Sequence, residues 1–210
     1  MNRPLFSVIV PAHNSEAYIK KGLHSIRQQS FRDFELIVVC DRCTDDTPGI
    51  ALGYADKTLI RDFGHDGLAR NAGIDAAEGE WLLFMDDDDW WLHEYVLQML
   101  SEKIDQNPAA DIIAFSFIFR HIGYATPIRN INGQHWPACW CKCYRREAVN
   151  GSRFSDITDG SADMQFFTQM FFRGLKVVDW DMPLYYYNYW RDDSISERQT
   201  YDFRGRTDLL

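Results

Sequence analysis

The sequence predicts an α/β domain built on a mainly parallel, doubly wound sheet. Two observations support this fold class: short apolar runs alternate with amphipathic segments through the first hundred residues, and polar segments follow the apolar runs. The runs are apolar throughout, as expected of strands that helices cover on both faces. The chain has 210 residues, of which 46% are hydrophobic, so it is long enough for one domain with a substantial core.

The first half of the sequence alternates predicted strands with predicted helices. Four apolar runs are predicted strands: FSVIVP (6–11), FELIVVC (34–40), KTLIR (57–61) and WLLFM (81–85). A helix is expected after each strand, because apolar residues recur there at helical spacing. The first helix is expected at 16–29, after an N-cap at Asn14 or Ser15. The second is expected to begin after Thr47 as N-cap, with Pro48 as its first residue. The other two are expected at 66–77 and at about 96–104.

The pattern changes near residues 105–110. DIIAFSFIF (111–119) predicts a long strand, ACWCKCYRR (138–146) is strand-like, and ADMQFFTQMFFR (162–173) predicts a helix. LKVVDW (175–180) and the aromatic PLYYYNYW (183–190) are predicted as two closing strands. We interpret the change as a boundary between two halves of one continuous domain, residues 1–105 and 106–210.

Composition limits the partners and the compartment. The formal net charge of −9 argues against a nucleic-acid backbone or an anionic membrane as the main partner. No run approaches the roughly 20 apolar residues of a membrane span. The N-terminal segment MNRPLFSVIVPAHN is not typical of a signal peptide, because its apolar run is too short and its flank is too polar. We therefore expect a cytoplasmic location.

The five cysteines form an odd set, which favours free thiols in a reducing compartment. A zinc site is the alternative, although Cys-x2-Cys followed by Cys-x-Cys-x-Cys does not match the usual paired spacing. Period 2 would place Cys139, Cys141 and Cys143 on one face of a strand.

Residues 85–91, MDDDDWW, place four consecutive carboxylates after a predicted strand. Two like charges about 4 Å apart repel by about 4 kcal/mol near a protein surface. A bound cation offsets this repulsion, and carboxylate oxygens suit Mg²⁺ or Mn²⁺. A solvated acidic loop is the alternative, but the two tryptophans argue against a fully exposed tip. Because PAHN and DRCTDD also follow strand ends, all three segments should meet at one edge of the sheet.

Several enzyme classes are poor fits. The sequence has no G-x-x-x-x-G-K-[ST] phosphate loop, no G-x-G-x-x-G after the first strand and no G-x-S-x-G elbow. An aspartyl phosphatase would place its nucleophile after the first strand, where this chain has Pro11 and His13.

Four stretches of the sequence together resemble family 2 glycosyltransferases of the GT-A fold. These stretches are PAHNSEAYIKKGLHSIRQQSFRDFELIVVCDRCTDDT, GLARNAGIDAAEGEWLLFMDDDDWW, WCKCYRRE and the aromatic tail that ends in SIS. They occur in the family's order and spacing and cover residues 6 to about 196. The resemblance implies a GT-A fold, with residues 1–105 as the nucleotide-sugar-binding half and residues 106–210 as a mixed acceptor-binding half.

The resemblance also assigns roles in binding the donor. It implies that Asp86 and Asp88 bind a divalent cation, Mn²⁺ or Mg²⁺, and that Asp86 and the intervening Asp87 contact the donor diphosphate. The cation would act as a Lewis acid on the departing diphosphate. His13, beside Pro11, takes the position that stacks on the base, Asp41 would accept the N3–H of uracil, and Arg70 matches the arginine that reaches the nucleotide. Cys40 stands where relatives carry a second acid, and Arg42-Cys43 stands where Gly-Ser is usual.

Asp163 matches the catalytic base of the family, at the start of the late helix. Ala162 replaces the acid that usually precedes this base, and Asp156 and Asp159 are nearby in sequence. A base that accepts the proton of the acceptor hydroxyl during a single displacement inverts the anomeric centre. Most of the late aromatic residues are expected in the core, with Trp136 or Trp140 facing the acceptor.

The resulting expectation is an inverting, metal-dependent transferase of polysaccharide biosynthesis. The donor would be a nucleotide-sugar, most simply a UDP-sugar, and the acceptor a hydroxyl of a glycan or of a lipid-linked glycan. Peripheral association with the inner face of the membrane is a further expectation. Two alternatives stay open: a noncatalytic sugar-nucleotide binding module and a metal-dependent nucleotidyltransferase.

Overall fold

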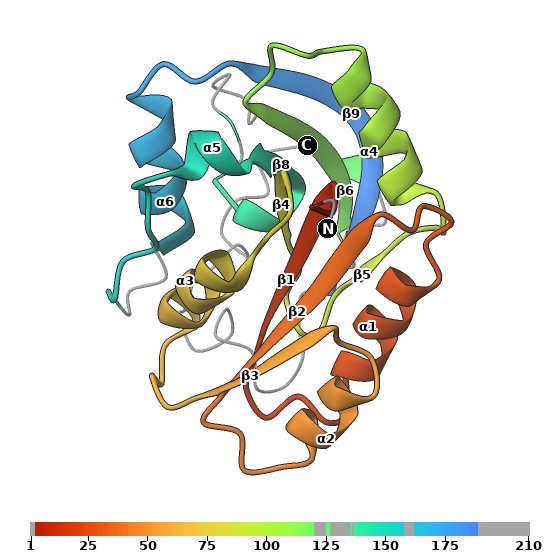
Figure 1. Ribbon diagram of the computed structural model, residues 1–210, viewed down its shortest axis with the longest axis vertical. Helices are drawn as coiled ribbons and strands as arrows, with labels where there is room; N and C mark the ends of the chain where they lie inside the picture. Colours follow the sequence, from red (N-terminus) through yellow and green to blue (C-terminus); the bar gives the residue numbers. More distant parts are fainter. Residues whose placement is uncertain (1–2, 120–124, 127–134, 136, 158–161, 189–210) are drawn as a thin grey trace, which may run out of the picture.

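The computed structural model describes residues 3–119, 125–126, 135, 137–157 and 162–188. One mixed sheet runs through this part of the chain, with strand order β3-β2-β1-β4-β8-β6-β9-β5 and with β7 beside β6 (Figure 1). Its strands are β1 (Phe6–Ala12), β2 (Phe34–Asp41), β3 (Lys57–Arg61), β4 (Trp81–Phe84), β5 (Trp90–Trp91), β6 (Ile112–Phe119), β7 (Ala125–Thr126), β8 (Lys142–Arg145) and β9 (Val177–Tyr187).

The first half of the sheet is the predicted parallel unit. Strand β1 pairs in parallel with β2 and β4, and β2 pairs in parallel with β3. A helix follows each of the four strands: α1 (Ile19–Arg27), α2 (Thr47–Leu52), α3 (Asp66–Ala76) and α4 (Val96–Asp105). The strand–helix alternation expected from the sequence is confirmed, and it brings the ends of β1, β2 and β4 to one edge.

Helices cover both faces of this sheet, so that the core has two clusters. Successive strand residues alternate between them: Val8 and Val10 face the cluster that includes residues of α1, α2 and α4, whereas Ile9 faces the cluster that includes residues of α3 and α6 (Ala162–Phe171). Figure 1 shows α1 and α4 on one side of the strands and α3 and α6 on the other. Burial on both faces explains why the strands are uniformly apolar.

The second half extends the same sheet with mixed pairings. Strand β8 is antiparallel to both β4 and β6, and β9 is parallel to β6 and antiparallel to β5. Two short elements flank β8: the 3₁₀ helix η1 (Cys139–Cys141) before it and α5 (Arg146–Val149) after it. No helix in the described ranges is long and apolar enough to cross a bilayer.

The first helix begins later than the sequence suggested. Helix α1 starts at Ile19 rather than at residue 16, and neither Asn14 nor Ser15 caps it. Asn14 has a left-handed backbone (φ 46°), and its Oδ1 accepts from Thr44 N–H (2.7 Å). Ser15 N–H donates to Thr47 Oγ1 (2.8 Å). These polar groups therefore join the loops after β1 and β2 instead of capping a helix.

The prediction that Cys139, Cys141 and Cys143 lie on one face of a strand is wrong. Cys139 and Cys141 lie in η1, and only Cys143 lies in β8, so the stretch is not one strand. The 3₁₀ turn rotates the chain by one third of a turn per residue. As a result Cys139 packs in the α3 and α6 cluster, whereas Cys141 and Cys143 pack in the opposite one.

The two expected closing strands are one strand, β9. Its pairing with β6 shifts on both sides of Ser116, which lies opposite Pro183. Proline has no N–H for the ladder, and an irregular register lets a strand continue past it. Strand β5, a two-residue pairing with β9, was not expected at all.

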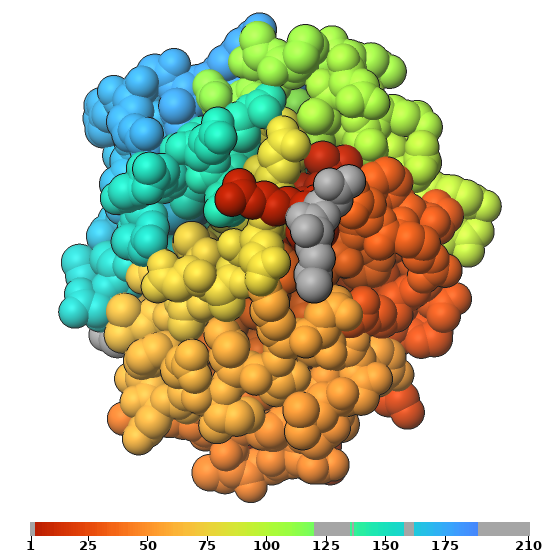
Figure 2. Space-filling view, in the orientation of Figure 1, coloured from red at the N-terminus to blue at the C-terminus, as the bar shows by residue number. Residues whose placement is uncertain are grey.

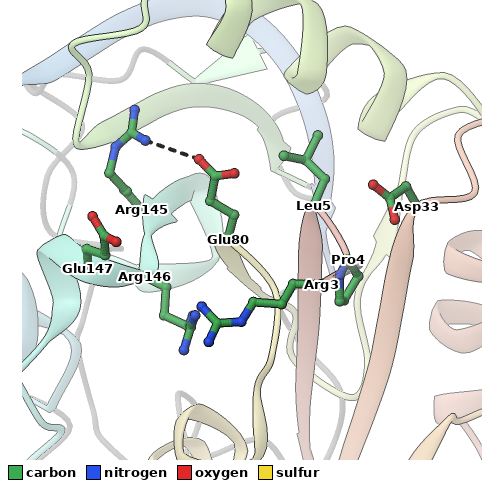
Figure 3. Close-up of a pocket in the computed structure, with 8 residues that line it drawn as sticks. All are labelled: Arg3, Pro4, Leu5, Asp33, Glu80, Arg145, Arg146 and Glu147. Atoms are coloured by element: carbon green, nitrogen blue, oxygen red, sulfur yellow. Dashed lines mark hydrogen bonds and ion pairs between the residues drawn. The ribbon is translucent and has the colours of Figure 1, made fainter. Parts of the chain in front are cut away.

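A hollow of about 300 Å³ lies at the edge where β1 begins, opposite the strand ends discussed below. Figure 2 shows the segment that precedes β1, in dark red, at the surface on this face of the molecule. Arg145 Nη1 pairs with Glu80 Oε1 at 3.2 Å, and Figure 3 shows the Arg3 and Arg146 guanidinium groups pointing toward one another. This hollow contains none of the residues that the sequence assigned to the site.

Candidate functional site

Three loops meet at the carboxyl ends of β1, β2 and β4, as the sequence predicted. His13 N–H, after β1, donates to Asp87 Oδ2 (3.1 Å), after β4. His13 Nδ1 donates to the main-chain oxygen of Asp41 (2.7 Å), the last residue of β2. The segments PAHN, DRCTDD and MDDDD therefore form one surface.

Arg70 lies at the centre of the charged part of this surface. It belongs to α3, and only 5% of the residue is exposed. Its Nη2 donates to Asp86 Oδ1 (2.7 Å), its Nη1 donates to Asp66, and Nη1 lies 4.0 Å from Asp163 Oδ1. Its Nε is buried and has no hydrogen-bond partner among the residues that the structure describes. One guanidinium thus holds carboxylates from three separate segments.

The four carboxylates of the acidic run have different environments. Asp86, Asp87 and Asp88 are partly exposed, whereas Asp89 is fully buried. Asp89 accepts from Tyr185 Oη (2.5 Å) through Oδ2 and from Asn188 N–H (2.7 Å) through Oδ1. Asp86 N–H in turn donates to Tyr185 Oη (3.1 Å). The fourth acid therefore fixes the run to β9, and the first three face the site.

Burial shifts the pKa values of two of these acids upward. Burial and the charge of Asp163 raise the pKa of Asp86 to about 6, although Arg70 opposes the rise and a quarter of the Asp86 side chain stays exposed. Burial, together with the charges of Asp88 and Asp86, also raises the pKa of Asp89 well above its ordinary value. A cation at the exposed acids would reduce this like-charge repulsion.

The donor atoms at this edge fit Mg²⁺ or Mn²⁺. Asp86 and Asp88 offer partly exposed carboxylate oxygens, which are the hard ligands that these ions prefer. In the part of the chain that the structure describes, no three His, Cys, Asp or Glu residues are close enough together to hold a metal by themselves. Such ions commonly complete their coordination with substrate phosphates and water. The fit is therefore to a cation held jointly by the protein and a phosphate-bearing ligand.

Asp163 lies in the first turn of α6 and faces Arg70. Its Oδ2 accepts from Cys139 N–H (3.1 Å), while Oδ1 is the atom near Arg70. About a quarter of its side chain is exposed (24%). The carboxylate is thus held in place on one oxygen and remains accessible from the surface.

The residues expected to contact the nucleotide base of the donor differ in solvent exposure. His13 is exposed, whereas Pro11 lies within β1 and is buried opposite Val39. Asp41 is 4% exposed, and its two carboxylate oxygens accept from the N–H groups of Phe63 (2.6 Å) and His65 (2.8 Å). Asp41 thereby fixes the chain between β3 and α3 next to the site.

Trp140, one of the two tryptophans considered for the acceptor surface, is buried. Its ring stacks on Tyr185 and on Tyr187, with ring centroids 4.7 Å apart in each pair, and only 4% of the residue is exposed. Trp140 therefore lies in the core, as expected of most late aromatic residues, and it is not the tryptophan that faces an acceptor. Trp136 lies outside the described residues.

Comparison with known sequences assigns the chain to a family. Residues 7–173 match the profile of glycosyl transferase family 2. The chain belongs to this family. The resemblance to family 2 glycosyltransferases and the expected GT-A fold are thereby confirmed.

Similar proteins include named glycosyltransferases of bacteria. This family 2 chain is 30% identical to EpsH of Bacillus subtilis (strain 168), over 89% of the chain and 61% of EpsH. It is 38% identical over 110 residues to the poly(ribitol-phosphate) beta-N-acetylglucosaminyltransferase TarS of Staphylococcus aureus (strain Mu50 / ATCC 700699), covering 49% of the chain and 19% of TarS.

Solved structures share its fold. A fragment of S. aureus TarS in complex with UDP-GlcNAc superposes with a TM-score of 0.81 at 26% identity, covering 91% of this family 2 chain and 60% of the fragment. The mannosyltransferase PcManGT from Pyrobaculum calidifontis, in complex with GDP-Man and Mn²⁺, gives 0.72 at 20% identity over 94% and 61% of the two chains. The chain thus spans about 60% of the length of EpsH and of these structures.

Two parts of the site were not found from the sequence of this family 2 chain. Asp66 pairs with Arg70 one helical turn away, and their i,i+4 spacing was a readable signal. The contact between Tyr185 and Asp89 joins residues 96 positions apart, so no local pattern could reveal it.

Proposed function

We propose that the chain is the transferase part of an inverting glycosyltransferase that moves a sugar from a UDP-sugar to a hydroxyl of a glycan or lipid-linked acceptor. The observation that supports this most directly is the arrangement around Arg70, which holds Asp86 and Asp163 at one edge of the sheet. The acid proposed to face the diphosphate and the candidate base thus lie beside one guanidinium. The UDP-GlcNAc in the TarS complex supports the choice of donor class.

The proposed roles divide between the loops. His13 stacks on the base of the donor beside Pro11, and Asp41 accepts from the base or orients the loop that contacts it. Arg70 and Asp87 contact the nucleotide, while Asp86 and Asp88 hold a divalent cation together with the diphosphate. When bound, this cation supplies Lewis-acid stabilisation of the charge that develops on the departing diphosphate.

In the proposed reaction Asp163 accepts the proton of the acceptor hydroxyl. As the proton leaves, the hydroxyl oxygen bonds to the anomeric carbon and the bond from that carbon to the diphosphate oxygen breaks. Attack from the face opposite the leaving group inverts the anomeric centre. Cys139 N–H keeps Asp163 Oδ2 in place, and Oδ1, which lies 4.0 Å from Arg70 Nη1, is the oxygen proposed to accept the proton.

Release of the nucleoside diphosphate tests this proposal. The chain is incubated with Mn²⁺ and a panel of UDP-sugars, with GDP-mannose as the comparison, and free UDP is measured with and without EDTA. We expect slow, metal-dependent release of UDP even without acceptor, because transferases transfer sugar to water at a low rate. A noncatalytic binding module would release none. A nucleotidyltransferase would instead release pyrophosphate from UTP and a sugar 1-phosphate, which a parallel reaction measures.

A further inference from the structure

Two cysteines, Cys40 and Cys43, lie at the edge of the candidate nucleotide site and have no role in the proposed transfer. Cys40 is in β2 and is fully buried, whereas Cys43 follows the strand and is half-buried. Cys40 belongs to the core cluster beneath α1, and Cys43 packs against the same cluster. Both thiols therefore lie on the same face of the sheet, and both are free in this structure.

The two thiols lie near one another at the end of β2. Each side chain shifts the pKa of the other. Arg42, between them, has a left-handed backbone (φ 51°), and this turn brings Cys43 back over the end of the strand. Cys43 Sγ also lies 3.5 Å from the main-chain oxygen of Ala12, the residue opposite Cys40 in the β1–β2 ladder. A Cys-x-x-Cys turn that brings its two thiols near one another needs only a local movement to form a disulfide.

The surroundings activate one of the two thiols. The hydrogen bond from Cys40 lowers the pKa of Cys43 to about 7, against the effect of burial, and His13 contributes to the lowering. The same hydrogen bond and burial raise the pKa of Cys40 above its ordinary value. The lowered pKa favours the thiolate of Cys43, which is the nucleophilic form of the side chain.

We propose that Cys40 and Cys43 form a reversible disulfide on exposure to a hydroperoxide, and that this disulfide weakens nucleotide binding at the adjoining site. In the first step Cys43 attacks a peroxide oxygen, the O–O bond breaks, and the departing oxygen leaves as water, so that Cys43 becomes a sulfenic acid. In the second step Cys40 sulfur bonds to Cys43 sulfur, the S–O bond breaks, and the hydroxyl leaves as water with the Cys40 proton. Two thiols and one hydrogen peroxide thus give one disulfide and two waters.

The link to binding passes through Asp41, and this part rests on the proposed function. The main-chain oxygen of Asp41 accepts from His13 Nδ1 (2.7 Å) and lies 3.8 Å from Cys43 Sγ. A disulfide encloses Asp41 and Arg42 in a small ring and draws Cys43 away from this oxygen toward Cys40. The same oxygen holds His13. The His13 imidazole, which is proposed to stack on the nucleotide base, therefore loses its fixed position. We expect nucleotide affinity to fall about tenfold, because that is the effect of losing one ordinary hydrogen bond.

The test uses the chain as it is, first reduced and then treated with hydrogen peroxide. Intact mass should fall by two hydrogen atoms. Trypsin cleaves after Arg42, so Cys40 and Cys43 enter separate peptides, 33–42 and 43–57, which the disulfide should keep linked. The affinity for UDP with Mn²⁺, measured by calorimetry, should fall about tenfold on oxidation and return after treatment with dithiothreitol.

Two variants serve as controls. Cys43→Ser should bind UDP equally before and after peroxide, whereas Cys143→Ser, at a buried position in β8, should respond as the wild type does. Peroxide treatment that leaves both thiols free, or that oxidises Cys43 without linking the two peptides, would overturn the disulfide. A linked pair with unchanged UDP affinity would overturn its effect on binding. If the reduced chain binds no UDP at all, the proposed function fails, while the peptide map still decides the disulfide.

Discussion

At the scale of single residues, the central feature is one buried arginine among three carboxylates. Arg70 was assigned to the nucleotide, Asp86 to the metal and Asp163 to catalysis, each from its own stretch of sequence. Of these three residues the sequence placed only Asp86 at this edge, and it could not show that Arg70 contacts Asp86 at 2.7 Å and lies 4.0 Å from Asp163. Their meeting depends on how α3, β4 and α6 pack together. The same guanidinium therefore organises both the proposed leaving-group side and the proposed base side.

Replacing Asp163 by Asn should abolish most transfer and preserve the fold. Asparagine keeps the acceptor oxygen for Cys139 N–H but cannot take a proton, so we expect kcat to fall about a hundred- to ten-thousandfold. The melting temperature should change little. Asp156→Asn is the matched control, because Asp156 is an exposed acid nearby in sequence. Full activity of the Asp163 variant, measured as sugar transfer, would remove this residue from the base role.

Replacing Arg70 by Ala should destabilise the chain. The change leaves Asp86 and Asp163 close together without a cation, and removing one partner of a buried ion pair costs about 3 kcal/mol. The control is Arg153→Ala, because the Arg153 pair with Asp75 (2.9 Å) is solvent-exposed and should cost less than about 1 kcal/mol. Urea unfolding measures both. Equal losses in the two variants would show that Arg70 does not stabilise this group of carboxylates.

At the scale of secondary-structure elements, a second polar cluster joins the opposite ends of the strands. Glu35, at the start of β2, accepts from Ser7 Oγ (2.6 Å) in β1 and from the N–H groups of Glu78 (2.6 Å) and Gly79 (3.2 Å) before β4. Its other oxygen pairs with Lys57 Nζ (2.9 Å) of β3. One carboxylate thus ties together the beginnings of four strands.

The Glu35 cluster predicts a pH dependence of stability. Burial alone would raise the pKa of Glu35, but the hydrogen bonds from Ser7, Lys57 and Glu78 lower it below the ordinary value. A depressed folded-state pKa stabilises the fold above the unfolded pKa, and this stabilisation is lost as pH falls through the folded value. Glu35→Gln should therefore cost about 2 kcal/mol at pH 7, and the difference from wild type should shrink below about pH 4.

Urea titrations from pH 7 to pH 3 follow this difference. Glu102→Gln, on the exposed face of α4, is the control and should differ little from wild type at any pH. A Glu35 variant whose deficit stays constant across the range would contradict the charge-based account.

Elements with a long local pattern could be predicted, and those set by distant contacts could not. Strands β1, β2 and β4 were found because each is a run of apolar residues, and α3 and α4 because of their spacing. At the 3₁₀ turn Cys139–Cys141, Cys139 N–H donates to Asp163 Oδ2 (3.1 Å), 24 positions away in the sequence. Strand β5 exists only through its pairing with β9. In both cases a distant or nonlocal partner decides the structure.

At the scale of the whole molecule, the charge distribution requires a cation for the proposed function. The chain carries a formal net charge of −9, and the candidate site adds a row of acids to the edge where a diphosphate would bind. Arg70 is already engaged by its own carboxylates. A divalent ion between Asp86, Asp88 and the donor would offset the repulsion between two anionic partners.

Calorimetric titration with UDP, in the presence and absence of Mn²⁺, tests this account most directly. GDP and CDP serve as controls for the base, and Asp88→Ala serves as the control for the metal ligand. We predict UDP binding that is selective among the three nucleotides, depends on Mn²⁺ and loses its metal dependence in the variant. Failure to bind any of the three nucleotides, with or without Mn²⁺, would contradict the proposal that this edge of the sheet is a nucleotide-sugar site.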